Sequence, residues 1–331
     1  LKIDTETQSV KLSGGKSVKY DKLLVATGSK PFVPPMEGLD TVENKFTFMT
    51  LNDAKVLNDA LTPESRVLIV GAGLIGLKCA EGIQNRVKEI QVVDLADRIL
   101  PSIIDEDGSE MVQKHIESKG IKFSLSNSVA KFEKNKATLQ NGEVVDFDVL
   151  VMAVGVRPNT ELVAEAGGEV NRGIVTDNAC KTSLEGVYAA GDCTESFDIT
   201  TGEQKIMALL PNAYMQGEVA GINMAGGEAH YNKGIPMNAI GFFGLHMITA
   251  GSYNGDAEVT KTKDSYKKLV TKDDLLKGYI MIGNVERAGI YTSLIREQKP
   301  LSTIDFALIK EKPQLMAFTK RERAKTLGGA L

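Results

Sequence analysis

The segment Gly71-Ala72-Gly73-Leu74-Ile75-Gly76 constrains the fold more than any other part of the sequence. It follows the apolar run Arg66 to Val70 and opens a stretch of helical character that extends to Arg86. In such a strand–turn–helix the first glycine makes the tight turn, the second lets the backbone approach a pyrophosphate, and the third lets helix and strand pack closely. The helix N-terminus offers free N–H groups to the phosphates. This context predicts a dinucleotide site; the alternative is a glycine-rich turn that binds nothing.

Asp94 ends the next apolar run, 21 residues after Gly73. A carboxylate at this point accepts hydrogen bonds from an adenosine ribose and repels a 2′-phosphate. The sequence therefore favours NADH over NADPH. Arg98 lies nearby in the chain and is the residue that could serve a 2′-phosphate instead.

Apolar strands and amphipathic helices alternate around this motif, which predicts an α/β fold with a parallel sheet covered by helices. The expected strands are Arg66 to Val70, Ile90 to Asp94, Ile121 to Leu125 and Asp148 to Ala153. The expected helices are Thr50 to Leu61, Gly71 to Arg86 and Asp105 to Lys119. Thr50 and Asp53 have capping-box spacing, and Asn141-Gly142 predicts a hairpin turn.

Two segments echo each other on either side of this fold. Ala26-Thr27-Gly28 and Ala153-Val154-Gly155 each close an apolar strand, and each is followed by a proline, Pro31 or Pro158. Each alone is a strand-to-loop signal. As a pair they mark two crossings of the chain between domains.

A third glycine motif is Gly186-Val187-Tyr188-Ala189-Ala190-Gly191-Asp192. It places Asp192 just past the carboxyl end of a strand, where open α/β sheets bind ligands. Asp192 could hydrogen-bond a polyol such as a ribityl chain, or it could be an ordinary turn aspartate.

Taken together, these motifs resemble the pyridine nucleotide-disulfide oxidoreductase superfamily, and within it the NADH-dependent rubredoxin reductase, nitrite reductase and NADH oxidase-like group. The resemblance implies that Gly71 to Gly76 bind NADH and that Gly191 and Asp192 bind FAD. It further implies that the helix starting at Pro211-Asn212-Ala213 points at the flavin, that Thr27 and Gly28 lie along FAD, and that Gly155 lies at the nicotinamide side.

The same resemblance gives the expected domains: an FAD-binding domain at 1–35 and 154–232, an NAD-binding domain at 36–153, and an α+β interface domain at 233–331. Both dinucleotide-binding domains are expected to be Rossmann-like. The first is incomplete, because the family's opening flavin motif, about one hundred residues with its surroundings, is absent from this sequence. In the last domain a helix is expected from Asn284 to Arg296, and the apolar stretch Ala239 to Leu245 is either strand core or interface.

Three departures from the family pattern bear on the chemistry. Cys79, Cys180 and Cys193 are not at the family's redox positions, and their spacing predicts neither a metal site nor disulfides. His230 and His246 lack the context of the histidine that serves glutathione reductases. Lys78 stands where many relatives have a glutamate, and it is either a cation near the flavin or a solvated helix lysine.

Composition excludes several classes of function. The net charge of −4 lacks the basic surplus of nucleic-acid-binding proteins. No stretch approaches the roughly 20 apolar residues of a membrane helix. Scattered thiols without CxxC spacing fit a reducing compartment, so a cytoplasmic protein is expected.

The expected function is hydride transfer from NADH to FAD and then to an acceptor such as rubredoxin, another small redox protein, a small molecule or a nitrite-reducing centre. The cofactors carry this chemistry, so no residue is nominated as catalytic. One alternative is an NADH oxidase, peroxidase or CoA-disulfide reductase that uses a cysteine of the absent segment. Another is a redox-gated interaction protein without enzymatic function. A homodimer is also possible through the C-terminal domain.

Overall fold

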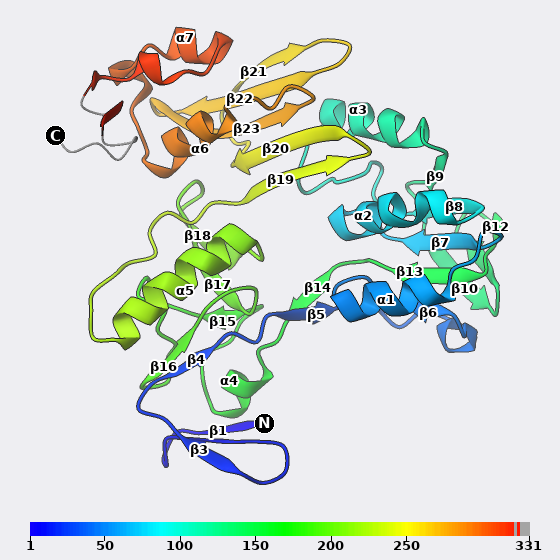
Figure 1. Ribbon diagram of the computed structural model, residues 1–331, viewed down its shortest axis with the longest axis horizontal. Coiled ribbons are helices and arrows are strands. Elements are labelled where there is room, and N and C mark those ends of the chain that lie inside the picture. Colours follow the sequence, from blue (N-terminus) through cyan, green and yellow to red (C-terminus); the bar gives the residue numbers. More distant parts are fainter. Residues whose placement is uncertain (321–322, 325–331) are drawn as a thin grey trace. The chain divides into compact units, whose positions relative to one another are not determined.

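The computed structural model describes residues 1–320 and 323–324, which form two compact units (Figure 1). One unit holds Leu1–Ser29, Pro158–Ala239 and the described residues from Met247 onward. The other holds Lys30–Arg157 together with Ile240–His246. The predicted α/β class with a separate antiparallel sheet is confirmed. The assignment of cofactors to domains stays a prediction.

The second unit is built on a five-stranded parallel sheet. Its strand order is β6 (Lys45–Phe46), β13 (Val149–Met152), β7 (Arg66–Val70), β8 (Glu89–Val93) and β9 (Ile121–Ser124). The helices of this unit are α1 (Leu51–Ala60), α2 (Leu74–Ile83) and α3 (Glu106–Glu117), with short 3-10 turns at Leu39–Thr41 and Gln84–Arg86 (Figure 1). The predicted β-α-β-α-β order is confirmed, and so is the capping box at Thr50 and Asp53.

The central strand β7 is buried on both faces, which explains its unbroken apolar run. Leu68 packs in a core with Phe132 and Phe147, whose rings meet edge to face at 6.1 Å. This core is covered by a three-stranded sheet of β10 (Val129–Glu133), β11 (Lys136–Leu139) and β12 (Val144–Asp146). Ile69 points to the opposite face, where its side chain lies against Gly76 of α2.

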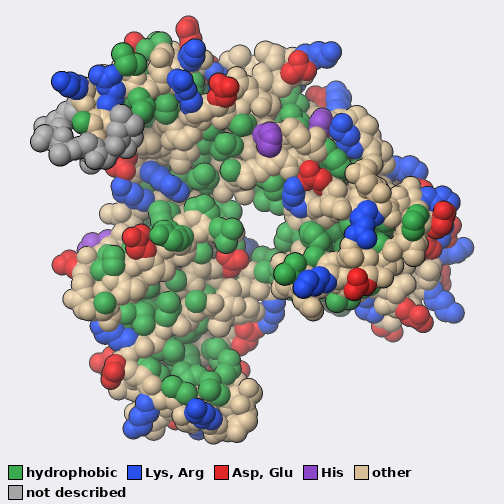
Figure 2. Space-filling view, in the orientation of Figure 1, with side chains coloured by type: hydrophobic (Ala, Val, Ile, Leu, Met, Phe, Trp, Pro, Cys, Tyr) green, Lys and Arg blue, Asp and Glu red, His purple; other side chains and the backbone are tan. Residues whose placement is uncertain are grey.

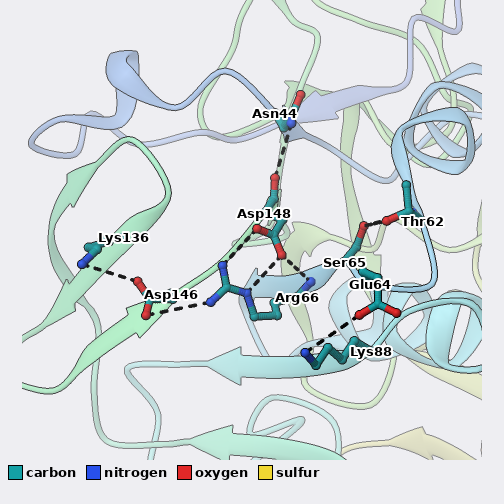
Figure 3. A network of polar contacts seen from close by, with 9 residues as sticks. All are labelled: Asn44, Thr62, Glu64, Ser65, Arg66, Lys88, Lys136, Asp146 and Asp148. Atoms are coloured by element: carbon teal, nitrogen blue, oxygen red, sulfur yellow. Dashed lines mark hydrogen bonds and ion pairs between the residues drawn. The ribbon is translucent and has the colours of Figure 1, made fainter.

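The amino end of the sheet is closed by an arginine–carboxylate pair (Figure 3). Arg66, at the start of β7, donates to Asp148 through its main-chain N–H, its Nε and its Nη2, at 2.9, 3.1 and 3.0 Å. Asp148 directly precedes β13, so the bidentate pair ties the first residues of two neighbouring strands. The guanidinium of Arg66 holds the pKa of Asp148 below its ordinary value.

The first unit contains several small sheets. β1 (Lys2–Asp4), β2 (Ser9–Lys11) and β3 (Ser17–Lys19) form an antiparallel sheet. β4 (Leu23–Val25) pairs in parallel with β16 (Val187–Ala189). The remaining elements are β15 (Ile174–Val175), β17 (Thr194–Asp198), β18 (Glu203–Ile206), α4 (Glu161–Glu165) and α5 (Leu210–Met224). Where the chain passes between the units, β5 (Ser29–Pro31) pairs with β14 (Val156–Pro158).

The C-terminal part is a five-stranded antiparallel sheet with helices. Its order is β19 (Met237–Phe242), β20 (Leu245–Gly251), β23 (Leu275–Ile282), β22 (Tyr266–Lys272) and β21 (Asp256–Lys261). The helices are α6 (Ala288–Arg296) and α7 (Phe306–Glu311), with 3-10 turns at Leu301–Thr303 and Leu315–Ala317. The buried rings of Tyr279 and Tyr291 join β23 to α6, with centroids 5.6 Å apart.

The prediction for α6 was wrong at its start. The helix begins at Ala288 instead of Asn284, because Arg287 adopts a left-handed backbone with φ 58° that cannot continue a helix. Strands β20 and β21 were not predicted. Every residue of β21 is exposed, so this strand lacks the alternation of apolar and polar residues that marks a half-buried strand.

Across the described ranges, 1–320 and 323–324, no helix has the length and apolar character needed to cross a membrane. On the face drawn in Figure 2, cationic and anionic side chains are interspersed.

Candidate functional site

The first and third glycines of the predicted dinucleotide motif are required by the protein itself. Gly71 has φ 116°, and a Cβ there would lie 2.3 Å from the carbonyl oxygen of Ala153. A Cβ on Gly76 would lie 2.0 Å from the carbonyl oxygen of Gly71. Both positions therefore exclude a side chain, and together they bring α2 close to the end of β7.

The second glycine differs from its two neighbours. Gly73 has an ordinary extended backbone, φ −82° and ψ −175°, and a Cβ there would meet nothing within 4 Å. Gly73 is the N-cap of α2, no side chain caps the helix, and its first turn has no acidic residue. The N-terminus of α2 is thus uncapped by any side chain and has open space beside Gly73, which fits the pyrophosphate of a dinucleotide.

Asp94 lies just past β8 and touches the same turn. Its Oδ2 accepts a hydrogen bond from the N–H of Ala72 at 2.6 Å, and its Oδ1 accepts one from Ala96 at 2.8 Å. Each carboxylate oxygen can accept a second bond, so two acceptor positions remain for ribose hydroxyls. Arg98 pairs with Asp97 at 2.8 Å, and among residues 1–320 and 323–324 no cation pairs with Asp94.

A second group of predicted residues meets in the other unit. Ser29 Oγ donates to Asp192 Oδ2 at 3.1 Å, which brings the start of β5 beside the loop after β16. Thr27 Oγ1 donates to the carbonyl oxygen of Asn159 at 2.7 Å, and Asn159 Nδ2 donates back to Thr27 at 2.8 Å. Gly28, with φ 64° and nothing within 4 Å of a Cβ, leaves this loop open to a ligand. Ser29 and Asn159 carry no signal in the sequence, because neither belongs to a glycine motif.

The start of α5 borders the same loops. Gly191 has φ 85° and donates its N–H to Gln216 Oε1 of α5 at 2.6 Å. Ala213 lies 3.6 Å from the position of a Cβ on Gly191. Asn212 is 1% exposed; its Nδ2 donates to Ile235, while its Oδ1 has no partner in the described part of the chain. A buried acceptor without a partner fits a bound group that donates a hydrogen bond, as a flavin ring can.

Gly155 lies in the unit that contains the glycine turn, and Gly28 lies in the other unit. The backbone of Gly155 is left-handed with φ 114°, and its carbonyl oxygen accepts the N–H of Phe32 at 2.9 Å. The Arg157 guanidinium lies 4.3 Å from the centre of the Phe32 ring, a cation–π contact that steadies this strand pair.

The three cysteines supply no reactive thiol. Cys79, Cys180 and Cys193 are all free and buried. Burial raises the pKa of Cys79 and of Cys180 to about 12, so both stay protonated at neutral pH. Within the described residues no group of histidines, cysteines or carboxylates could hold a metal ion.

Comparison with known proteins places this arrangement among redox enzymes. A family model described as "Pyridine nucleotide-disulphide oxidoreductase" matches residues 1–217. The chain is 31% identical to the "NADH-dependent phenylglyoxylate dehydrogenase subunit epsilon" of Aromatoleum evansii, over 91% of this chain and 74% of that protein. It is 39% identical to an "NADH oxidase" of Methanocaldococcus jannaschii, over 65% of this chain and 49% of that protein.

Among solved structures, a NAD-dependent persulfide reductase from A. fulgidus aligns with a TM-score of 0.81 and 27% identity. The alignment covers 90% of this chain and 61% of the persulfide reductase. The chain thus spans about half of the curated NADH oxidase and less than two thirds of the persulfide reductase.

Proposed function

Since the chain belongs to the pyridine nucleotide-disulphide oxidoreductase family, we propose that it forms the NADH-binding and electron-delivering part of a flavoprotein that reduces a separate acceptor. The membership confirms the expected class, an FAD-dependent NAD(P)H oxidoreductase, and its cofactors FAD and NADH. The acceptor is the proposed part. A small redox protein such as rubredoxin, or a nitrite-reducing centre, is the preferred class.

The turn at Gly73 is the observation that carries the proposal. The N-terminus of α2 is uncapped and has open space beside Gly73. Asp94 lies next to this turn, and each of its carboxylate oxygens can accept one more hydrogen bond. Gly73 and α2 would bind the pyrophosphate of NADH, and Asp94 would orient its ribose. FAD, when bound, would supply the redox chemistry, namely hydride acceptance and the transfer of electrons singly or in pairs.

The buried cysteines favour an external acceptor over an internal disulfide. A thiol relay needs an accessible thiolate near the flavin, and Cys79, Cys180 and Cys193 are buried. The name of the Aromatoleum relative, a subunit of an NADH-dependent dehydrogenase, agrees with delivery to another protein.

The test is anaerobic stopped-flow absorbance of the full-length protein at ~450 nm, the region of flavin absorbance, after mixing with NADH or NADPH. We expect NADH to bleach the flavin at least about tenfold faster than NADPH does. A tenfold ratio of rates corresponds to a difference of roughly 1.4 kcal/mol in activation free energy. Equal rates would contradict the role of Asp94. A protein without flavin absorbance, or one that neither nucleotide bleaches, would refute the oxidoreductase proposal and favour the interaction-protein alternative.

A second candidate is an enzyme that reduces oxygen, peroxide or a disulfide through a cysteine outside these 331 residues. The likenesses to an NADH oxidase and a persulfide reductase favour it. Thiol titration of the denatured full-length protein, before and after anaerobic reduction by NADH, separates the two. The preferred proposal expects an unchanged thiol count, whereas an internal redox disulfide would add two thiols and a cysteine sulfenic acid one.

A further inference from the structure

A tight turn far along the chain is bonded to the helix that follows the glycine motif. The turn Gly241–Gly244 consists of the last two residues of β19 and the two residues that lead into β20, and it belongs to the same compact unit as α2. Glu81 of α2 accepts the main-chain N–H of Phe243 through Oε1 at 2.6 Å. The Glu81 side chain is only 24% exposed, so this charge-assisted hydrogen bond is partly shielded from water.

Lys78 makes the second contact with this turn. Its Nζ forms an ion pair with Glu81, donates to the carbonyl oxygen of Gly241 at 3.2 Å, and lies 5.8 Å from the centre of the Phe242 ring. Phe242 itself is fully buried. Lys78 is therefore neither a freely solvated lysine nor an unpaired cation. Lys78 and Glu81, three residues apart on α2, both form hydrogen bonds with the main chain of the turn.

Helix α3 supplies a third contact. His115 Nε2 lies 3.1 Å from the carbonyl oxygen of Phe243, so that nitrogen carries the hydrogen. Phe243 has φ 50°, a left-handed backbone that is strained for a non-glycine residue and persists only where its surroundings hold it. The hydrogen bonds from α2 and α3 to both its N–H and its carbonyl do so.

We propose that Glu81 and Lys78 are positioning residues for NADH, and that the turn Gly241–Gly244 is a clasp that holds α2 in its binding orientation. On its buried side α2 is held by the close approach at Gly76 and by apolar side chains such as Leu77 and Ile83, none of which can form a polar bond to its neighbours. The clasp adds hydrogen bonds from its main chain to Glu81 and Lys78. Because the phosphate-facing N–H groups belong to the first turn of α2, a shift of the helix axis moves all of them.

NADH binding and the contacts of the clasp are thermodynamically coupled, so each can be measured through its effect on the other. If the clasp favours NADH binding, NADH binding must favour the clasp by the same factor. Saturation with NADH is therefore expected to slow hydrogen exchange of the Phe243 amide. That amide is chosen because its acceptor, Glu81, is a side chain of α2.

The experiment compares the full-length holoprotein with its Glu81→Ala and Glu81→Gln variants. Equilibrium NADH binding is measured anaerobically with the flavin reduced beforehand, so that no turnover occurs, together with the limiting rate of flavin reduction. For Glu81→Ala we expect the Kd of NADH to rise about fivefold to tenfold, with a limiting rate within about twofold of the parent. Glu81→Gln keeps an oxygen that can accept the Phe243 N–H, so it should recover most of the affinity.

Glu133→Ala, which removes an exposed ion pair with Lys131 in the same unit, is the matched control and should change neither quantity. An unchanged Kd in Glu81→Ala, or Phe243 exchange insensitive to NADH, would overturn the clasp, whatever the melting temperature does. This inference rests on NADH being the ligand of the glycine turn. Failure of the parent protein to bind NADH would refute the proposed function itself, which distinguishes the two failures.

Discussion

The two ends of the parallel sheet use a carboxylate in opposite ways. At the amino end, Asp148 accepts three hydrogen bonds, all from Arg66, and its charge is neutralised by the guanidinium. At the carboxyl end, Asp94 accepts one bond on each oxygen, both from main-chain N–H groups. The first carboxylate gives three acceptor positions to one arginine and holds two strands together. The second holds the loop that carries Gly73 and retains acceptor positions, which is what a ligand site requires.

Of the changes at the two ends of the sheet, substitution of Gly73 should weaken NADH binding the most. Its backbone is allowed for any residue and a Cβ meets no protein atom, so Gly73→Val should fold, with a loss of about 1 kcal/mol because valine is a poor N-cap residue. The side chain would occupy the space proposed for the pyrophosphate. Loss of one charge-assisted hydrogen bond, about 1.5–3 kcal/mol, corresponds to NADH binding weaker by roughly 10-fold to 150-fold.

Gly76→Ala is the counterpart. Its Cβ would lie 2.0 Å from the Gly71 carbonyl oxygen, so we expect the fold itself to be destabilised. A thermal melt should show a lower melting temperature than that of the parent protein. If Gly73→Val bound NADH like the parent, the open space at Gly73 would have no part in binding.

Asp94→Asn should have the next largest effect. The amide has one acceptor oxygen where the carboxylate has two, so one loop contact and the repulsion of a 2′-phosphate are lost together. We expect NADH to bind about tenfold more weakly, for a loss of roughly 1.4 kcal/mol, and the preference for NADH over NADPH to shrink. Titration of the prereduced protein with each nucleotide measures both, and an unchanged preference would contradict the role of Asp94.

Asp148→Asn should leave NADH binding unchanged and lower the free energy of unfolding by about 1 kcal/mol at neutral pH, because the pair is partly exposed. The pKa of Asp148 is lowered in the folded protein, so its contribution is present above the unfolded pKa of about 4 and is lost as the pH falls below it. Chemical denaturation at pH 7 and near pH 3 checks the sign. A difference between parent and variant that grew in acid would refute this account.

The smallest effect is expected from thiol modification, which touches neither end of the sheet. With pKa values raised to about 12, Cys79 and Cys180 should resist alkylation at pH 7.5 in the folded protein. Mass spectrometry after iodoacetamide treatment should find both unmodified until denaturant is added. Rapid modification of Cys79 with loss of NADH binding would show that α2 opens far more readily than its burial indicates.

Much of the parallel sheet could be predicted, because its signals are local. The glycine motif, the capping box at Thr50 and the turn at Asn141-Gly142 each specify a backbone conformation within a few residues. The start of α6 could not be predicted, since the left-handed backbone of Arg287 leaves no mark in residue type.

The contacts around the candidate sites are long-range and were harder to foresee. Ser29 meets Asp192 across 163 positions of sequence, and Glu81 meets Phe243 across 162. A lysine and a glutamate three residues apart on a helix are typical of a solvated surface. Nothing in this pattern indicates that the turn Gly241–Gly244, with its buried Phe242, contacts both side chains.

The most direct test of the central claim is a crystal structure of the full-length protein with NADH bound. We predict pyrophosphate oxygens about 2.7–3.2 Å from main-chain N–H groups at Gly73 and Leu74, with a ribose hydroxyl donating to Asp94. NADH bound away from this turn, with Gly73 and Asp94 untouched, would contradict the account.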